Sequence, residues 1–452
     1  MDHPRVLHLC VRPMGTKTGT GLTFGRLYEG WPDDRLMQFC LQFNGTQGRG
    51  RMALIPATVS PADGARRLKS RVTTVLQHRS ESAIGFPAST PRPHGELRAL
   101  AGKVLETLPI WLSPTAREHI LDFDPEVIHF GPWGVRSMRL ATHLSRELDI
   151  PVVPHYMDTD LDTGYLHRRL GKPGRNLENR VHSQLLDRVP ICLVIGTDMG
   201  IEYSRRLDRT CVAAGNSIPD RDFATWESQR PRKHSGRVFY YAGSLYQGRG
   251  DVIAALAQAL QGADEGWRIE ISTPPWTMVQ ALDIQARHSN VKVLGSLEPV
   301  EVAPKLAASD FLLMVESTDE AESAYTRLSV STKVPEYLAA GRPVLAIGPA
   351  GQSSLKELSR HGRAVHATPA ALMQDLPGVL DRLLQLEDRV SSSPDPERAA
   401  HLVRAFGSTA VRDRFRECLR LASDAGPSGR VSAEDLDVTP LGFAAVNGKL
   451  TE

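Results

Sequence analysis

The chain has 452 residues, which exceeds the length of one ordinary domain and predicts two or three. Hydrophobic residues make up 41% and charged residues 23%, the proportions of a soluble globular protein, so wholesale disorder is excluded. Lysine and arginine number 54 against 52 for aspartate and glutamate, and a net charge of +2 gives no reason to expect nucleic acid as a partner.

Two further features bear on the cellular compartment. No apolar run approaches the roughly 18 residues that a membrane-spanning helix needs, and the opening MDHPRVLHLCV has the pattern of a strand, not of a signal peptide. The five cysteines are scattered without any Cys-x-x-Cys pair, which favours reduced packing residues over disulfides or a zinc site. We therefore expect a cytoplasmic protein.

Short apolar runs alternate with longer segments of helical period, the pattern of a parallel sheet covered by helices. The strands expected in the first half are 6–11, 36–42, 127–130, 152–155 and 192–195. A second series is expected at 238–241, 268–272, 291–294, 311–315 and 344–347. The sequence thus predicts an α/β protein with two doubly wound domains, whose strand ends face each other across a ligand crevice.

The stretch 218–236 contains two prolines and many charges and has little periodicity, so we place the domain boundary there. This gives a first domain over 1–218 and a second over 219–407. A helix over 408–422 is expected to pack back on the body, because its apolar residues share one face. Glycine, proline, serine and aspartate dominate 423–452, which predicts a disordered tail.

The most informative stretch is 329–345, SVSTKVPEYLAAGRPVL. Pro335 suits the first turn of a helix, Gly341 suits its left-handed end, and Pro343 prevents continuation into the next strand. These three residues predict a short helix with well-defined ends.

The amino end of this helix is a candidate site for a diphosphate. Free backbone N–H groups and the partial positive charge of the helix lie there, and Ser331, Thr332 and Lys333 add donors. Glu336 lies one turn further along, where a carboxylate can accept two hydrogen bonds from a ribose diol. The residues alone leave a second interpretation open. In it, the segment is an ordinary capped helix, and the negative charge of Glu336 interacts favourably with the helix dipole.

The run from Glu336 to Val344, Glu-Tyr-Leu-Ala-Ala-Gly-Arg-Pro-Val, resembles the signature helix of the retaining family-4 glycosyltransferases of the GT-B fold. The resemblance extends over most of the chain. It implies two Rossmann-like domains, the first receiving the acceptor and the second holding a nucleotide sugar. The family's usual Glu-x7-Glu pair has its first position at Leu328 here, and the Ser-x-Lys-x-x-Glu-Tyr-Leu pattern resembles a divergent branch often found among surface-polysaccharide enzymes.

The loop after the first strand of the second domain supports the same resemblance. Gly243-Ser-Leu-Tyr-Gln-Gly-Arg-Gly stands where the family has a Gly-Arg-x-x-x-x-Lys-Gly segment, which implies that Gly243 meets the donor and that Arg249 grips the diphosphate. Ser244 replaces a common arginine. The alternative for Arg249 is a solvated loop charge.

Three acidic residues after the strand at 311–315 are candidates to replace the acid that is missing at Leu328. They are Glu316, Glu320 and Glu322. The interpretation that we favour from the sequence is a solvated acidic loop.

A glycine-rich loop follows the first strand of the chain. Gly19 and Gly21 let the backbone approach a phosphate or sugar closely, and the resemblance places this loop at the interdomain cleft. The spacing is Gly-x-Gly-x-x-x-Gly and no ribose-binding acid ends the second strand, so a nicotinamide site is disfavoured. The alternative is an ordinary tight turn.

Polar residues also follow two strands of the first domain. The resemblance suggests that His155 meets the donor sugar or positions the acceptor hydroxyl, and that Asp158 orients this hydroxyl. A structural hydrogen-bonding role for His155 is equally consistent. His129 and Trp133 are expected to face the acceptor, although a large aromatic is more often part of a core. The Asp-x-Asp pattern at Asp158 belongs to the single-domain glycosyltransferase fold, and we predict no metal.

The segment 66–76 places apolar residues on one helical face beneath basic ones, as in helices that lie on anionic membranes. Its alternative is a helix that only covers its own domain. Peripheral contact with the inner face of a membrane would bring the enzyme to a lipid-linked acceptor.

Together these features predict a metal-independent enzyme without a cofactor that transfers sugar from a nucleotide sugar to a hydroxyl of a glycan or lipid-linked acceptor. Lys333, Arg249 and the helix amino end would stabilise the departing diphosphate. The resemblance implies retention of configuration. Two alternatives stay open: a nucleotide-sugar epimerase or hydrolase of the same fold, and a non-catalytic nucleotide-sugar or polysaccharide-binding protein.

Overall fold

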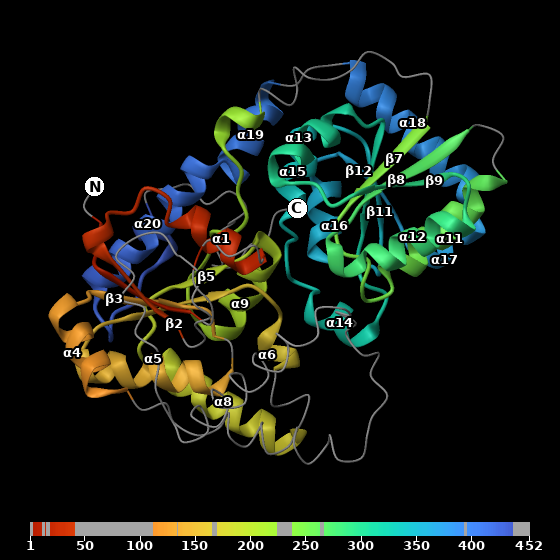
Figure 1. The fold of residues 1–452 in the computed structure, drawn as a ribbon. Helices are drawn as coiled ribbons and strands as arrows, with labels where there is room; N and C mark the ends of the chain where they lie inside the picture. Colours follow the sequence, from red (N-terminus) through yellow and green to blue (C-terminus); the bar gives the residue numbers. More distant parts are fainter. Residues whose placement is uncertain are drawn as a thin grey trace, which may run out of the picture.

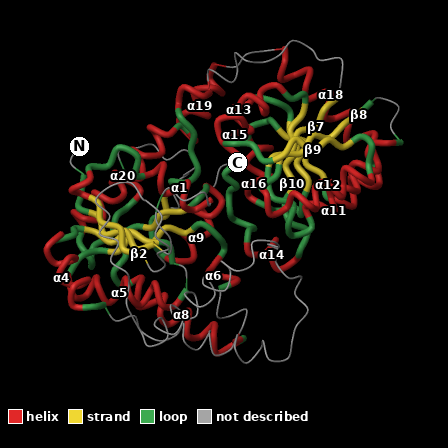
Figure 2. The backbone as a smooth tube through the Cα atoms, in the orientation of Figure 1, coloured by secondary structure: helices red, strands yellow, loops and turns green. Residues whose placement is uncertain are grey.

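The computed structural model describes residues 3–10, 14, 19–40, 112–132, 134–164, 170–223, 237–262, 266–392 and 396–436. They form two lobes, and each lobe is built on a parallel sheet with helices against its faces (Figure 1). The two groups of strands stand apart in Figure 2, with loops and helix ends between them. The predicted α/β architecture of two doubly wound units is confirmed.

The sheet of the first lobe has β1 at the point where the strand order changes direction. Its strands, in spatial order, are β2 (Leu36–Cys40), β1 (Val6–Cys10), β3 (Val127–Phe130), β4 (Val152–Tyr156), β5 (Cys192–Val194) and β6 (Cys211–Ala213). The helices of this lobe are α1 (Gly19–Leu27), η1 (Asp33–Arg35), α4 (Pro114–Phe123), α5 (Val135–Leu148), α6 (Asp160–Thr163), α8 (Lys172–Leu186) and α9 (Thr197–Leu207).

The sheet of the second lobe reverses its order between β7 and β10. Its strands, in spatial order, are β12 (Ala364–Ala367), β11 (Val344–Ile347), β10 (Phe311–Val315), β7 (Arg237–Ala242), β8 (Trp267–Ser272) and β9 (Val291–Gly295). The helices are α11 (Arg249–Gln261), η2 (Pro275–Thr277), α12 (Met278–Arg287), α13 (Pro299–Ala308), α14 (Glu320–Tyr325), α15 (Lys333–Ala340), α16 (Ser353–Arg360), α17 (Pro369–Gln374) and α18 (Leu376–Ser392). In such a sheet, ligands bind outside the carboxyl ends of the strands at the reversal point.

Strand β10 illustrates why these sequences fold as central strands. All five residues of Phe311–Val315 are apolar and buried, because helices cover both faces of the sheet. Leu312 and Met314 join an apolar cluster that extends into the first lobe, whereas Phe311, Leu313 and Val315 join a separate cluster on the other face.

The carboxyl-terminal helices link the lobes. Helix α19 (Pro396–Phe406) is followed by α20 (Ser408–Ala425), which returns to the first lobe and inserts Phe415 beside Tyr28 of that lobe. Beyond α20 the described chain runs to residue 436, past the predicted start of a disordered tail at 423, and the Val431 amide donates to the carbonyl of Pro190. Within the described ranges, no helix is long and apolar enough to cross a membrane.

Three buried histidines occupy neighbouring strands of the first sheet. His8 on β1 and His129 on β3 lie with their Nδ1 atoms 3.0 Å apart, and Nε2 of His129 is 3.2 Å from Nδ1 of His155 on β4. The Tyr28 hydroxyl is 2.8 Å from Nδ1 of His129. Burial, with smaller opposing effects, lowers the pKa of both His8 and His155 to about 3, so all three rings are neutral at pH 7.

This arrangement predicts a loss of stability in mild acid. His8 and His155 take up protons near pH 6.5 in the unfolded chain but only near pH 3 in the folded one, so their contribution to stability is complete above pH 6.5. As the pH falls from 6.5 to 5, His8 and His155 should each lower the free energy of unfolding by about 2 kcal/mol.

Urea unfolding followed at several pH values measures this loss. His8→Asn should reduce the slope of stability against pH, whereas His119→Asn, at an exposed position of α4, should leave it unchanged. A free energy of unfolding that is constant between pH 7 and pH 5 would contradict the assignment.

Candidate functional site

The carboxyl edges of the two sheets meet through the segment that precedes α15. The Asn216 amide donates to the carbonyl of Val330 at 2.7 Å and accepts from the hydroxyl of Thr23 on α1 at 2.6 Å. A side chain at Gly196 would overlap Val330, so the lobes approach each other closely there. These contacts hold α1 against the segment that leads into α15.

Lys333 lies at the amino end of α15, facing the loop that follows β7. Its Nζ is 4.8 Å from the ring centroid of Tyr241, and a Cβ on Gly243 would overlap it. Burial is the main cause that lowers the pKa of Lys333 to about 8, and Arg249 lowers it further, whereas the carboxylates of Glu316 and Glu336 raise it. The ammonium group is therefore still mostly charged at pH 7.

Arg249, the first residue of α11, is held by four contacts. Its Nε donates to the carbonyl of Val315 at 3.2 Å, and Nη1 donates to the carbonyl of Tyr246 and to Oε1 of Gln247. Nη2 lies 3.4 Å from Oε2 of Glu316. The side chain is only 16% exposed, so Arg249 is not the solvated loop charge of the alternative interpretation.

The three candidate acids after β10 lie in different surroundings, and the buried Glu316 does not belong to the solvated loop that we favoured. Glu316 is 6% exposed and faces Arg249, whereas Glu320 is exposed at the first position of α14. Glu322 is half-buried, and its amide donates to the side chain of Asp319, which caps α14. Of the three, Glu316 is the one that contacts Arg249, because it directly follows the buried strand β10.

Glu336 is half-buried one turn into α15. Burial raises the pKa of its carboxyl, and the positive charges of Arg26 and Lys333 oppose this rise. Arg26 belongs to α1 of the first lobe, where it also donates to the carbonyl of Ser217. The carboxylate of Glu336 thus lies within the electrostatic influence of both lobes.

The predicted donor residues near α1 and α15 come together in part. Gly19 lies at the start of α1, and a Cβ placed on it would be 4.0 Å from Cγ2 of Thr332. Ser331 accepts a hydrogen bond from the backbone of Lys333 at 3.4 Å. Gly21 is buried within α1, two residues before Thr23, which contacts Asn216.

The predicted catalytic pair of the first lobe is divided between the core and the domain junction. His155 lies within β4 with its ring buried, because the strand continues to Tyr156, one residue further than expected. Asp158 accepts from the hydroxyls of Ser329 at 2.6 Å and Tyr325 at 3.2 Å, both from the second lobe. Burial raises the pKa of Asp158, and these two hydrogen bonds oppose the rise.

The predicted acceptor residues are only partly described. His129 is buried in the array of three histidines, and Trp133 lies outside the described residues, as does the segment 66–76. Leu328 is 2% exposed and packs at the domain junction, where its amide is 3.2 Å from the hydroxyl of Thr159. Among the residues described, no cluster of three histidine, cysteine or acidic side chains could hold a metal ion.

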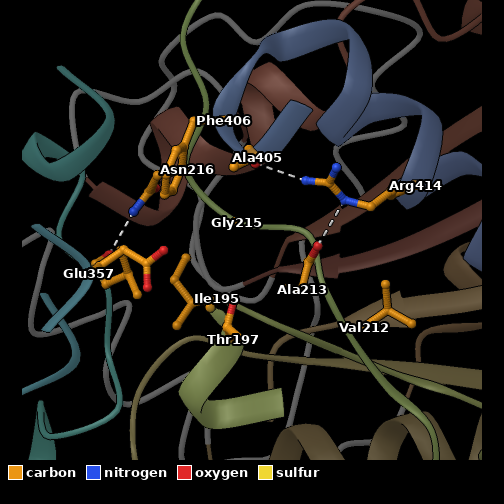
Figure 3. Close-up of a pocket in the computed structure, with 12 residues that line it drawn as sticks. Ile195, Thr197, Val212, Ala213, Gly215, Asn216, Glu357, Ala405, Phe406 and Arg414 are labelled. Atoms are coloured by element: carbon orange, nitrogen blue, oxygen red, sulfur yellow. Dashed lines mark hydrogen bonds between the residues drawn. The ribbon is translucent and has the colours of Figure 1, made fainter. Parts of the chain in front are cut away.

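A small pocket lies beside the Asn216 contact, near the carboxyl ends of β5 and β6 (Figure 3). Arg414 of α20 crosses one wall, donating to the carbonyls of Ala213 at 3.2 Å and Ala405 at 2.9 Å. Glu357 of α16 lies on the opposite wall. The cavity volume is about 50 Å³, which is enough for a few water molecules but not for a nucleotide.

Sequence reasoning missed Arg26 and the link between Glu316 and Arg249. Arg26 follows a glycine-rich run but belongs to no motif, and only the approach of the two lobes brings it towards Glu336. The position of Glu316 directly after the buried run Phe311–Val315 was the available signal, since strand ends at this edge face the ligand crevice.

No protein-family model matches the chain, and no curated protein matches it in sequence. Solved structures do match it. Anabaena HepE in complex with UDP is 16% identical with a TM-score of 0.54, covering 92% of this chain and 100% of HepE. HepE in complex with UDP and glucose is 15% identical with a TM-score of 0.53, and the match covers 93% of this chain and 100% of that one.

A glycosyltransferase from Rickettsia africae is 9% identical with a TM-score of 0.52, and the match covers 93% of this chain and 98% of that one. Together with the two parallel sheets, in each of which the strand order reverses once, these matches establish that the chain has the GT-B fold.

Gly243 offers a direct test of the cation site. Gly243→Ala places a methyl group where Nζ of Lys333 lies, at a φ of +148° that alanine rarely adopts. Because the lysine side chain can swing away, we expect a folded protein that binds pyrophosphate about tenfold more weakly, a loss of about 1.4 kcal/mol. Calorimetry measures the affinity, and Gly262→Ala, with only ordinary contact at its Cβ, is the matched control. Equal affinity in both variants would place the anion elsewhere.

Proposed function

We propose that the protein is a glycosyltransferase that uses a nucleotide sugar as donor. The observation that carries this proposal is the convergence of Lys333, Arg249 and the amino end of α15 at the reversal point of the second sheet. Two cations beside the positive end of a helix dipole suit a diphosphate. Glu336, one turn further along α15, suits the ribose diol of the same ligand.

The donor class follows from the same arrangement. The HepE structures contain UDP, and one of them also contains glucose, which supports UDP-linked sugars as the first donors to assay. In our proposal, Ser331 and Thr332 add donors for phosphate oxygens, and Gly19 and Gly243 leave room for the ligand at the walls of the cleft.

The proposed reaction breaks the bond between the anomeric carbon and the diphosphate and forms a bond from this carbon to an acceptor oxygen. The negative charge that grows on the leaving diphosphate is stabilised by Lys333, by Arg249 and by the helix dipole, all positioned before reaction. The acceptor proton passes to the leaving phosphate, which implies attack from the same face and retention of configuration. No metal is required in this scheme.

The first lobe would receive the acceptor. Asp158 lies at the junction of the lobes, 2.6 Å from Ser329, and orientation of the acceptor hydroxyl requires it to exchange this partner for substrate. His155 and His129 act in this proposal from within the core, by holding the β3 and β4 strand ends in place. A glycan or lipid-linked acceptor in surface-polysaccharide synthesis at the cytoplasmic face of a membrane fits the proposed chemistry.

Titration calorimetry with UDP, GDP and dTDP tests the donor site. The wild-type protein should bind one of them selectively, and Glu336→Ala should weaken this binding by about 1.5 to 3 kcal/mol, because charge-assisted hydrogen bonds to the ribose are lost. Glu118→Ala, at an exposed position of α4, should bind as the wild type does.

The result that would contradict the proposal is the absence of binding for all three nucleotides in a well-folded protein. If binding is found, sugar release from the donor alone, without an acceptor, would point to a hydrolase instead of a transferase.

A further inference from the structure

The guanidinium group of Arg249 is already engaged inside the protein. Its Nε and Nη1 donate to backbone carbonyls and to Gln247, and its Nη2 faces the carboxylate of Glu316 at 3.4 Å. For Lys333, in contrast, no ion pair or hydrogen bond of the ammonium group is found within the described part of the chain. The two cations of the site therefore differ in what a ligand must displace.

Glu316 is fixed in this position by its surroundings. Its backbone amide donates to the carbonyl of Ile347 at 2.9 Å. A Cβ placed on Gly348 would be 2.9 Å from the Cβ of Glu316, so the two segments are closely packed there. The next residue, Ser317, donates to the carbonyl of Gln247 at 2.8 Å and so ties the loop after β10 to the loop that carries Arg249. The backbone of Glu316 thus has little freedom to withdraw from the site.

A carboxylate at this place opposes the binding of any anion to Arg249. The opposition is large because like charges interact strongly where water is largely excluded. It also grows with the charge of the ligand. A nucleoside diphosphate carries about one negative charge more than the corresponding nucleotide sugar, because its terminal phosphate is not esterified.

We propose that Glu316 is a built-in competing anion, which occupies Arg249 in the empty site and makes the site discriminate against nucleoside diphosphate in favour of nucleotide sugar. This inference rests on the proposed function and deepens it. Glu316 then favours release of the nucleoside diphosphate after transfer, since the product meets the greater repulsion while the donor meets less.

The test compares the affinities of UDP and UDP-glucose, or of the pair whose base the protein selects. Glu316→Gln should tighten the binding of the nucleoside diphosphate about tenfold and the binding of the nucleotide sugar less. The ratio of the two dissociation constants therefore changes. In an Arg249→Gln background the same substitution should have a clearly smaller effect, because the competition for Arg249 is gone. If Glu316 had a purely structural role, its substitution would leave the ratio of the two dissociation constants unchanged, and its effect would be the same in both backgrounds.

Glu320→Gln is the matched control, since it removes the same charge from the exposed first position of α14, four residues further along the chain, and should leave both affinities unchanged. If Glu316→Gln fails to fold, Glu316→Asp, whose shorter side chain retracts the carboxylate from Arg249, should give an intermediate tightening.

Two results would overturn the inference and are distinguishable. Tight nucleotide binding by the wild type with an unchanged ratio in Glu316→Gln overturns the inference alone. Absence of nucleotide binding in the wild type and in every variant overturns the proposed function and the inference with it.

Discussion

The side chain of Asn216 is the contact on which the candidate site depends. It joins Thr23 on α1 to the carbonyl of Val330, two hydrogen bonds that are buried from solvent and so costly to break. Because Val330 precedes α15 by three residues, this contact sets where the amino end of α15 lies relative to α1. The positions of Lys333 and Glu336 in the crevice follow from it.

The electrostatics of the site follow from its burial. Burial lowers the pKa of Lys333 and raises that of Glu336, so each group is held in the surroundings that least favour its charge. A ligand that offers phosphate to one and hydroxyl groups to the other would relieve both. Groups with shifted pKa values are typical of binding and catalytic sites. The buried histidines of the first lobe avoid the cost of a buried charge by remaining neutral.

Much of the fold could be predicted from the sequence because its central strands are buried on both faces. The runs 127–130, 311–315 and 344–347 coincide with β3, β10 and β11, since a continuous apolar run with clear ends admits few alternatives. The strands β6 and β12 were missed. They have three and four residues and too little pattern to stand out from a loop.

The site was predictable where a local rule applied and not where tertiary packing decided. The helix 333–340 was predicted from Pro335 and Gly341, and Gly341 has the expected left-handed φ of +66°. The direction in which His155 points depends instead on how far β4 continues, and the burial of Glu316 depends on the loop from the neighbouring strand. Neither follows from spacing along the chain.

A crystal structure of the protein with bound UDP or the nucleotide that it selects would test the central claim most directly. We expect density for the diphosphate between Nζ of Lys333 and the amino end of α15, with the ribose beside Glu336. Density for the nucleotide in a different place, such as the carboxyl edge of the first sheet, would contradict it.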